Sequence, residues 1–526
     1  MTVRQGFYIV SLVVFVAIAL IAFVWLPVLW LLVLAVPLFL VGMRDARHGV
    51  HNVLRNYPVI GHIRYFAEFI RPEIQQYFIA TNQSGRPYSR EIRDVIGSRA
   101  HGGDGIQPFG TQHDLLDEGT DFALHSLAPK EPKRETARVL FGGAACKQPY
   151  DASRLNISAM SYGALSKNAV IAMNKGAALD NFYQDTGEGG LTPHHLEGGG
   201  DIVWELGTGY FGCRTADGKF DPDKFREKAL DERVKMVEIK VSQGAKPSHG
   251  GVLPAAKITE EISRIRGIPM GQDCISPPAH TAYSNPRGMM DFIVQLRELS
   301  DGKPVGFKLC IGRRSEFLSI VKAMMETGVT PDFIVVDGAE GGTGAAPLEF
   351  SNWLGAPLNE GLAFVHTSLV GAGLRDKLRL VASGKIATGF DMVVKTALGA
   401  DTCNMARPFR FTVGCIQAIR CHTNRCPTGV ATQDPNRYRA IDIDTKKNRV
   451  ATYHSRTIDS FLALVGAMGL DDPAQLTPAH VFQRQSDGRP WPYDRIFPGM
   501  EFGALTGRPV PESFAAEWDA ASADRF

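Results

Sequence analysis

The chain has 526 residues, with 57 Lys or Arg against 55 Asp or Glu, so its formal net charge is +2. This balance argues against nucleic-acid binding, which needs a basic surplus, and a hydrophobic content of 44% argues against disorder. The length suits one large enzyme domain with attachments, and eight cysteines in so long a chain favour a reducing compartment over a disulfide scaffold.

The first segment of the chain is almost wholly apolar, with no charged side chain between Arg4 and Arg44. About 20 helical residues cross a bilayer, so this run is too long for one ordinary crossing, and Pro27 would break a helix near its middle. We predict a transmembrane helical hairpin over residues 1–43, with helices of roughly 6–25 and 28–43. A single crossing and a signal peptide are the alternatives. Basic flanks on both sides predict a cytoplasmic membrane anchor with the catalytic domain facing the cytoplasm.

The sequence after the predicted anchor divides into three parts of different composition. Residues 44–150 mix aromatic and basic residues at helical spacing, which predicts a helical N-terminal extension. From 151 to 470, β-rich runs such as GFKLC alternate with Gly-rich loops and helical stretches, and residues 471–526 form a C-terminal tail. Repeated strand, loop and helix units predict an α/β fold, a (β/α)8 TIM barrel, with a doubly wound sheet as the alternative. GTGYFG (207–212) fits a dinucleotide fingerprint, but a turn-like stretch follows it, so we expect no nicotinamide site there.

The densest chemical signal is GCIQAIRCHTNRCPTGV, with Cys415, Cys421 and Cys426 spaced C-x5-C-x4-C. Three thiolates can hold three irons of a sulfide cluster, and Pro427 follows the last cysteine as in ferredoxin-type runs. Zinc sites usually use C-x2-C pairs and a fourth ligand, which His422 could supply. We expect an iron–sulfur cluster, with three buried structural cysteines as the alternative.

Glycine-rich loops follow several of the predicted strands. In a βα barrel, the last two strand ends commonly bind phosphate through backbone N–H groups. Here those ends would supply Ser383, Gly384, Lys385, Ala406 and Arg407. An earlier loop would let a flat ring approach the backbone at Gly341, Gly342 and Gly344. Each loop alone could be turn chemistry, but together they predict a phosphate-bearing flavin.

Six ordered motifs carry a family resemblance. They are SAMSYGALS, TGEGG, KVSQGAKPSHGGVLP, SPPAH, GGTGAAP and the cysteine run. In this order they resemble the FMN-binding synthase domain of glutamate synthase, over about residues 150 to 470. Residues 48 to 110 look like the front part of a shorter, stand-alone branch of that family.

The resemblance implies a barrel carrying FMN beside a 3Fe-4S cluster, in which 2-iminoglutarate is reduced to glutamate. It implies that Met160 and Ser161 lie at the flavin, and Glu188 near the flavin's reactive edge. Contacts to the 2-oxo acid or the flavin are implied for Lys240, Gln243, Lys246 and Arg266. The implied cluster ligands are Cys415, Cys421 and Cys426.

Elementary chemistry agrees with these roles. A dicarboxylate needs cations, which Lys240, Lys246 and Arg266 would supply. Lys308, at the end of the strand GFKL, would stabilise negative charge on the reduced flavin, and a desolvated Glu188 would shuttle protons. For each of these residues, a surface ion pair or a helix cap is the alternative.

The sequence also departs from the family. Ser248 and His249 stand where the family has Gly and Glu, and Val252 replaces a Gln, so the 2-oxo acid or amine is expected to differ. We expect no amidotransferase or nicotinamide domain. Ammonia would therefore be free or partner-supplied, and electrons would come from a partner protein or a membrane carrier.

The leading hypothesis is a membrane-anchored glutamate synthase-like oxidoreductase that reductively aminates 2-oxoglutarate, or a similar 2-oxo acid, with ammonia. The runner-up is a flavin amine or amino-acid dehydrogenase that passes electrons to a membrane carrier. The third hypothesis is a catalytically silent membrane scaffold.

Overall fold

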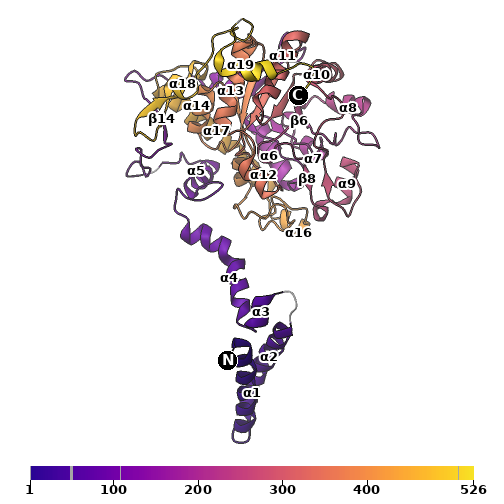
Figure 1. Ribbon diagram of the computed structural model, residues 1–526, viewed down its shortest axis with the longest axis vertical. Helices are drawn as coiled ribbons and strands as arrows, with labels where there is room; N and C mark the ends of the chain where they lie inside the picture. The colour runs from indigo at the N-terminus through magenta and orange to yellow at the C-terminus, as the bar shows by residue number, and fades with distance from the viewer. Residues whose placement is uncertain (1, 48–50, 107, 508) are drawn as a thin grey trace. The chain divides into compact units, whose positions relative to one another are not determined.

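The computed structural model describes residues 2–47, 51–106, 108–507 and 509–526. Contacts within the chain divide it into two compact units, Met1–Arg90 and Glu91–Phe526. Figure 1 traces the elements of both units along the chain.

The first unit begins with a helical hairpin. Helix α1 (Val3–Ala22) starts at a capping box, in which the Thr2 hydroxyl accepts a bond from Gln5 N–H and the Gln5 side chain accepts one from Thr2 N–H. The chain turns just before Pro27, passes through the 3-10 helix η1 (Leu26–Leu31) and continues as α2 (Leu32–Arg47). Phe39 of α2 stacks on Phe7 at 6.1 Å and meets Phe15 edge-on at 5.4 Å. The predicted hairpin is confirmed as a structural element, with the break before the proline, whose ring restricts the preceding residue.

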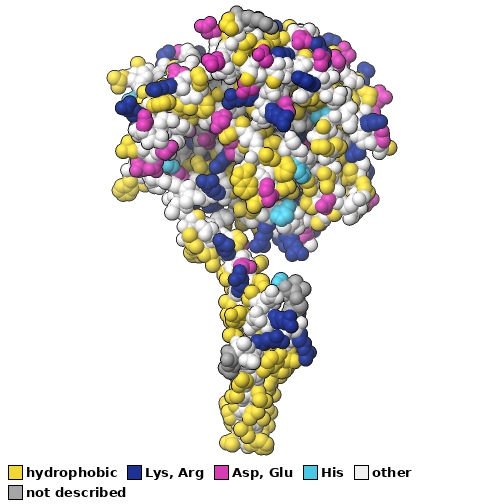
Figure 2. Space-filling view, viewed as in Figure 1, with side chains coloured by type: hydrophobic (Ala, Val, Ile, Leu, Met, Phe, Trp, Pro, Cys, Tyr) yellow, Lys and Arg dark blue, Asp and Glu magenta, His cyan; other side chains and the backbone are white. Residues whose placement is uncertain are grey.

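The hairpin exposes its apolar side chains. Leu12 and Leu34 are 65% and 66% exposed, and both segments, Val3–Ala22 and Leu26–Arg47, are long and apolar enough to cross a membrane. Figure 2 shows the hydrophobic side chains that cover this hairpin and the Lys and Arg side chains gathered next to them. Arg44 and Arg47 lie in the last turn of α2. Such a surface is costly in water, and few of its residues are covered by the protein itself.

Short helices complete the first unit and lead into the second. They are α3 (Asn52–Asn56), α4 (Gly61–Ile74), the π-helix η2 (Gln75–Ile79) and α5 (Arg90–Ala100). The buried Asp45 carboxylate ties α2 to α4 by accepting bonds of 2.9 Å from Val59 N–H and His62 Nε2. Residues 44–150 are therefore helical in their described front part. The prediction of a helical extension does not hold further on, because β1 (Asp121–Ala123) pairs with the distant β14 (Val481–Arg484) and β2 (Arg138–Phe141) forms a hairpin with the adjacent β3 (Tyr150–Ser153).

The second unit is built on a closed parallel barrel. Its strands, in order around the barrel, are β4 (Leu155–Ile157), β5 (Gln184–Asp185), β6 (Ile202–Leu206), β7 (Val234–Lys240), β10 (Val305–Leu309), β11 (Phe333–Asp337), β12 (Arg379–Ser383) and β13 (Thr402–Met405). The barrel closes where β13 pairs with β4, from Cys403 opposite Leu155 to Met405 opposite Ile157. This closure confirms the (β/α)8 prediction and rules out the open doubly wound sheet.

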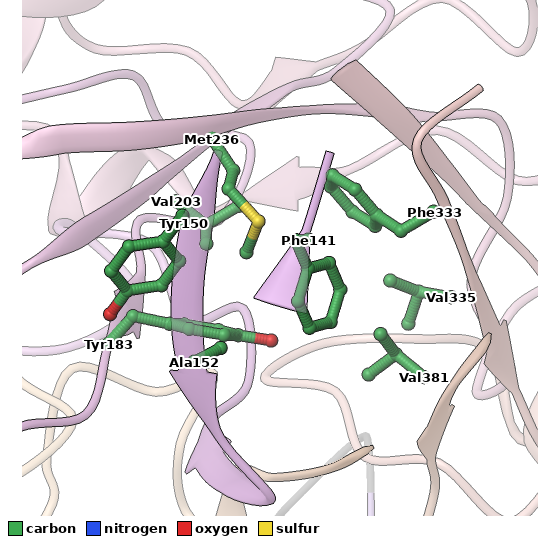
Figure 3. Close-up of a cluster of buried hydrophobic side chains, with 9 residues drawn as sticks. All are labelled: Phe141, Tyr150, Ala152, Tyr183, Val203, Met236, Phe333, Val335 and Val381. Atoms are coloured by element: carbon green, nitrogen blue, oxygen red, sulfur yellow. The ribbon is translucent and has the colours of Figure 1, made fainter. Parts of the chain in front are cut away.

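The barrel interior changes from apolar to charged along its axis. At the amino ends of the strands, a hairpin of β2 and β3 (Tyr150–Ser153) packs under the barrel, and Phe141 meets Phe333 at 5.7 Å. Figure 3 shows this cluster, which consists of Phe141, Tyr150, Ala152, Tyr183, Val203, Met236, Phe333, Val335 and Val381. Side chains alternate along a strand, so the inward positions two residues beyond Val203 and Met236 are Glu205 and Glu238. The apolar plug therefore leaves the carboxyl end of the barrel for polar chemistry.

Helices surround the strands (Figure 1). Between the strands run α6 (Lys167–Leu179), α7 (Pro193–Leu196), α8 (Pro222–Ala229), α9 (Glu260–Arg266), α10 (Pro286–Leu299), α11 (Arg314–Thr327), α12 (Leu348–Trp353), α13 (Leu358–Gly371) and α14 (Gly389–Ala397). After β13 follow α15 (Arg407–Thr412), α16 (Pro435–Tyr438) and α17 (Ile443–Ala467). The GTGYFG stretch opens no helix, as expected, since α8 begins only at Pro222.

The remaining strands are small. A short antiparallel pair, β8 (Val252–Leu253) and β9 (Cys274–Ile275), lies in the loop after β7. The C-terminal segment holds β14 (Val481–Arg484), β15 (Pro490–Pro492), α18 (Tyr493–Ile496) and α19 (Glu512–Ala520). Strand β14 pairs with β1, so the predicted tail is an integral part of the second unit.

Candidate functional site

The barrel gathers the predicted site residues at one rim. All eight strands are parallel, so their carboxyl ends meet on the same face. Met160 and Ser161 follow β4, Glu188 follows β5, and Lys240 ends β7. Ser383 ends β12 and Arg407 follows β13, so residues up to 250 positions apart in the sequence share this rim.

Glu188 and Lys240 form the centre of the site. The Glu188 carboxylate lies 3.1 Å from Lys240 Nζ, and only 16% and 10% of these side chains are exposed. Burial by itself raises the pKa of Glu188, but the charges of Lys240, Lys246 and Arg266 outweigh it and hold that pKa below its usual value. Three cations around one carboxylate leave a net charge of +2, which complements a dicarboxylate.

The other two cations are held by main-chain oxygens. Lys246 Nζ donates to Ala345 O at 2.9 Å, and burial lowers the pKa of Lys246 to about 8 although Glu188 partly offsets the effect. Arg266 donates to Tyr162 O at 2.9 Å and lies over the Phe211 ring at 5.0 Å. Burial also lowers the pKa of Arg266, so both cations gain by binding an anion.

Glu188, Lys240 and Gln243 line one small pocket, together with Thr208, Ser248, His249, Gly250 and Gly251. Gly251 permits the close approach, because a Cβ there would lie 2.0 Å from Glu188 Oε1. Ser248 has φ of 57°, a left-handed conformation that favours Gly, the residue of the resembled family at this position. His249 packs edge-on against Phe350 at 5.1 Å and its Nδ1 lies 2.9 Å from Gly250 O.

The predicted flavin loops converge beside this pocket. Gly187 lies against the backbone of Met160 and Ser161, since a Cβ there would be 2.6 Å from Ser161 N. On the opposite side Gly338 N–H donates to Ser383 O at 2.8 Å, and Arg407 donates to Glu340 O at 2.7 Å.

Small residues keep these loops close together. A Cβ on Gly342 would lie 2.7 Å from Arg407 Nε, one on Gly344 would be 4.0 Å from Ala164 Cβ, and Gly341 N–H donates to Gly338 O. Lys385 follows Gly384 with φ of 53°, which turns the chain sharply at the end of β12. Ala406 caps the start of α15. This glycine-walled arrangement fits a flat ring with a phosphate tail.

Lys308, at the end of β10, is buried among carboxyl groups. Its ammonium group pairs with Glu205 and lies 3.3 Å from Glu238, inside the barrel. Burial opposes its charge, but Glu205, Glu238 and Asp185 raise the pKa of Lys308 well above its usual value. The three carboxyl groups lie close enough to one another for a metal ion, but burial raises the pKa of Asp185 to about 8 and that of Glu238 well above its usual value, so protonation and the Lys308 ammonium together offset their charge. If Lys308 also contacts the flavin, its positive charge would already be largely offset by these carboxyl groups.

The three predicted cluster ligands lie within the electrostatic reach of one buried arginine. Arg410 donates to Cys421 Sγ at 3.0 Å, and its charge also interacts with Cys415 and Cys426. Among the described residues, no hydrogen-bond partner is present for its buried Nε. Lys257 donates to Cys421 O at 3.2 Å and to Ala164 O at 2.6 Å. This set of thiols and cations fits an anionic iron–sulfur cluster better than neutral structural cysteines.

The cysteine loop packs on the loop that follows β4. The Gln433 amide donates to Gly163 O and Leu165 O at 3.0 and 2.8 Å, and Asn424 donates to Ala256 O at 2.7 Å. Burial by itself raises the pKa of Cys426, but the backbone N–H groups of Ala431, Thr428 and Val430 and the Thr428 hydroxyl together lower it. The contacts of Gln433 hold the cysteine loop against residues 163–165, which follow the predicted flavin residues Met160 and Ser161 in the chain.

The sequence analysis missed several participants. His280 Nε2 lies 2.9 Å from Lys240 O and thereby braces the end of β7; the SPPAH motif contained it, without a role. Glu205 was detectable as the one charge in the strand IVWEL, and Glu238 as a charge between two apolar residues of VKMVEIK. Arg410 carried no local signal, because its neighbours are set by the fold of the cysteine loop.

Comparison with known proteins adds independent findings. Residues 134–471 match the family described as the conserved region in glutamate synthase. The glutamate synthase large subunit-like protein YerD of Bacillus subtilis is 36% identical over 500 residues, which cover 87% of this chain and 95% of that protein. The archaeal glutamate synthase (NADPH) of Methanocaldococcus jannaschii is 34% identical over 320 residues, 60% of this chain and 59% of that protein. A solved flavin-binding domain of baker's yeast flavocytochrome b2 aligns over 69% of this chain and 75% of its own, with 15% identity and a TM-score of 0.41, values that carry no functional argument.

Proposed function

This chain belongs to the glutamate synthase family, and we propose that it is an FMN and iron–sulfur oxidoreductase that acts on the CH–NH2 bond of an amino acid, formed from a 2-oxo acid and ammonia. The observation that carries the proposal is the Glu188–Lys240 pair, enclosed with Lys246 and Arg266 at the carboxyl rim of the barrel. Its net charge of +2 complements 2-oxoglutarate.

Reductive amination needs an imine to form and then to be reduced by two electrons. When bound, FMN supplies the hydride and a 3Fe-4S cluster supplies the single electrons that recharge it. Lys246 and Arg266 would hold the two carboxylates of the substrate, and Gln243 would orient its carbonyl group. The flavin would lie between Met160, Ser161 and the loop at 338–344, with its phosphate at residues 383–385, 406 and 407.

Glu188 would move the protons of imine formation. In the free site its low pKa keeps it ionised. A dianion bound at Lys246 and Arg266 would offset the charges that hold this pKa down, so Glu188 would become a stronger base when the substrate is present. Lys240 would then share its proton between the carboxylate and the carbonyl oxygen.

We further propose that the hairpin anchors the protein in the cytoplasmic membrane. The support is its length, its lack of charge and its exposed apolar surface. Arg44 and Arg47 at the end of α2 agree with the positive-inside tendency, so the barrel would face the cytoplasm. Electrons would come from a protein partner or a membrane carrier.

One experiment tests the chemistry. The purified full-length protein should contain about one FMN and three irons per chain. After anaerobic photoreduction, its flavin should be reoxidised by 2-oxoglutarate together with ammonium, but by neither alone. The membrane hairpin favours one other candidate, a dehydrogenase that delivers electrons to a membrane carrier. If oxidised flavin is instead bleached by an amine or amino acid, and the reduced flavin ignores the synthase substrates, that candidate replaces the synthase.

A further inference from the structure

A positive charge, that of Arg410, lies beside the predicted cluster ligands. Cys415, Cys421 and Cys426 would suffice as ligands, yet the buried side chain of Arg410 donates to Cys421 Sγ at 3.0 Å, and its charge also interacts with Cys415 and Cys426. Arg410 comes from α15, whereas the cysteines lie in the loop beyond it, so this loop folds back onto the helix at Cys421. Its guanidinium cannot lose its charge in a protein.

Not every hydrogen-bond donor of Arg410 has an acceptor within the described residues. Its Nε atom is buried and no partner faces it within the described residues. An unsatisfied buried donor is destabilising, so a retained one marks a position where an acceptor belongs. A sulfide or thiolate sulfur of a cluster between the three cysteines is such an acceptor.

Charge and hydrogen bonding to sulfur are among the features by which a protein tunes the reduction potential of an iron–sulfur centre. We propose that Arg410 is a positioning residue that stabilises the reduced, more negative form of the cluster and so raises its reduction potential. The inference rests on the proposed cluster at Cys415, Cys421 and Cys426. Lys257, which donates to Cys421 O, adds a second cation on the same side.

The same helix connects the two predicted cofactor sites. Arg407, one turn before Arg410, donates to Glu340 O in the glycine loop assigned to the flavin. Helix α15 therefore presents one arginine to each site. If the reduction potential of the cluster is higher, a weaker electron donor can reduce it. The cluster would then also retain its electron more strongly beside the flavin.

The test is an anaerobic redox titration of the purified full-length protein, following the paramagnetic signal of the oxidised cluster. In Arg410→Gln, the ratio of oxidised to reduced cluster at a fixed applied potential should rise at least about tenfold, which is 59 mV for one electron. Arg410→Lys keeps the charge and should shift the ratio by less than about threefold. Arg425→Gln is the matched control, since it removes an exposed arginine next to Cys426, where water screens the charge.

The outcomes separate this inference from the proposed function. Wild-type protein without iron would refute the cluster itself. Wild-type iron content together with an unchanged potential in Arg410→Gln would overturn only the role of Arg410. If Arg410→Gln loses its iron, Arg410→Lys decides, because a tenfold shift in that variant would contradict a role for the charge.

Discussion

Lys246 should make substrate binding depend on pH. Burial holds the pKa of Lys246 at about 8, so its ammonium group is charged below that pH and loses its proton above it. If this cation binds a carboxylate of 2-oxoglutarate, the affinity should be constant below about pH 7.5 and fall as the pH rises through 8. Because the protonated site binds more tightly, the apparent dissociation constant should rise by up to roughly tenfold per pH unit above 8 until it reaches the value of the deprotonated site.

The structure also limits the size of the effect. A charge-assisted hydrogen bond contributes about 1.5 to 3 kcal/mol, which corresponds to roughly tenfold to a hundredfold in affinity. Lys246→Ala should therefore bind 2-oxoglutarate ten to a hundred times more weakly at neutral pH, about as weakly as wild type does in alkali. Lys246→Arg should keep much of the affinity and lose the pH dependence, since a guanidinium stays charged throughout.

The assay is titration calorimetry of 2-oxoglutarate binding to the oxidised enzyme, from about pH 6.5 to 9.5 at constant ionic strength. Lys303→Met is a matched control. Burial also lowers the pKa of Lys303 to about 8, but its Nζ donates to Ala229 O and Asp231 O, away from the rim. If the alkaline fall persists in Lys246→Arg, or disappears in Lys303→Met, Lys246 is not the cation that binds the substrate.

Three further predictions test the other parts of the site. Glu188→Gln keeps the size of the side chain but removes the base, so flavin reoxidation in a single turnover should slow by about a hundredfold or more while FMN stays bound; an unchanged rate would exclude Glu188 as the proton carrier. Cys421→Ser should lose the irons and retain most FMN, and a wild-type iron content would reject the ligand assignment. Removal of residues 2–47 should give a soluble flavoprotein with wild-type turnover, and sedimentation of this protein with membranes after a high-salt wash would place the anchor elsewhere.

The sequence alone determined those features that depend on neighbours along the chain. The hairpin follows from an uncharged apolar run with Pro27 inside it. The barrel follows from the alternation of strands and helices, and the position of Glu188, Ser383 and Arg407 at one rim follows from the parallel direction of the strands. The family motifs then suggested roles for residues at this rim.

Only the tertiary structure decided which charged side chains contact one another. Barrel closure brings Lys308 of β10 to Glu205 of β6 and Glu238 of β7, two partners that its sequence position did not predict. Arg410 reaches Cys421 because the cysteine loop folds back over α15. The energy of a buried charge depends on partners within a few ångströms, and these partners come from segments that only the closed fold brings together, so sequence spacing could not reveal them.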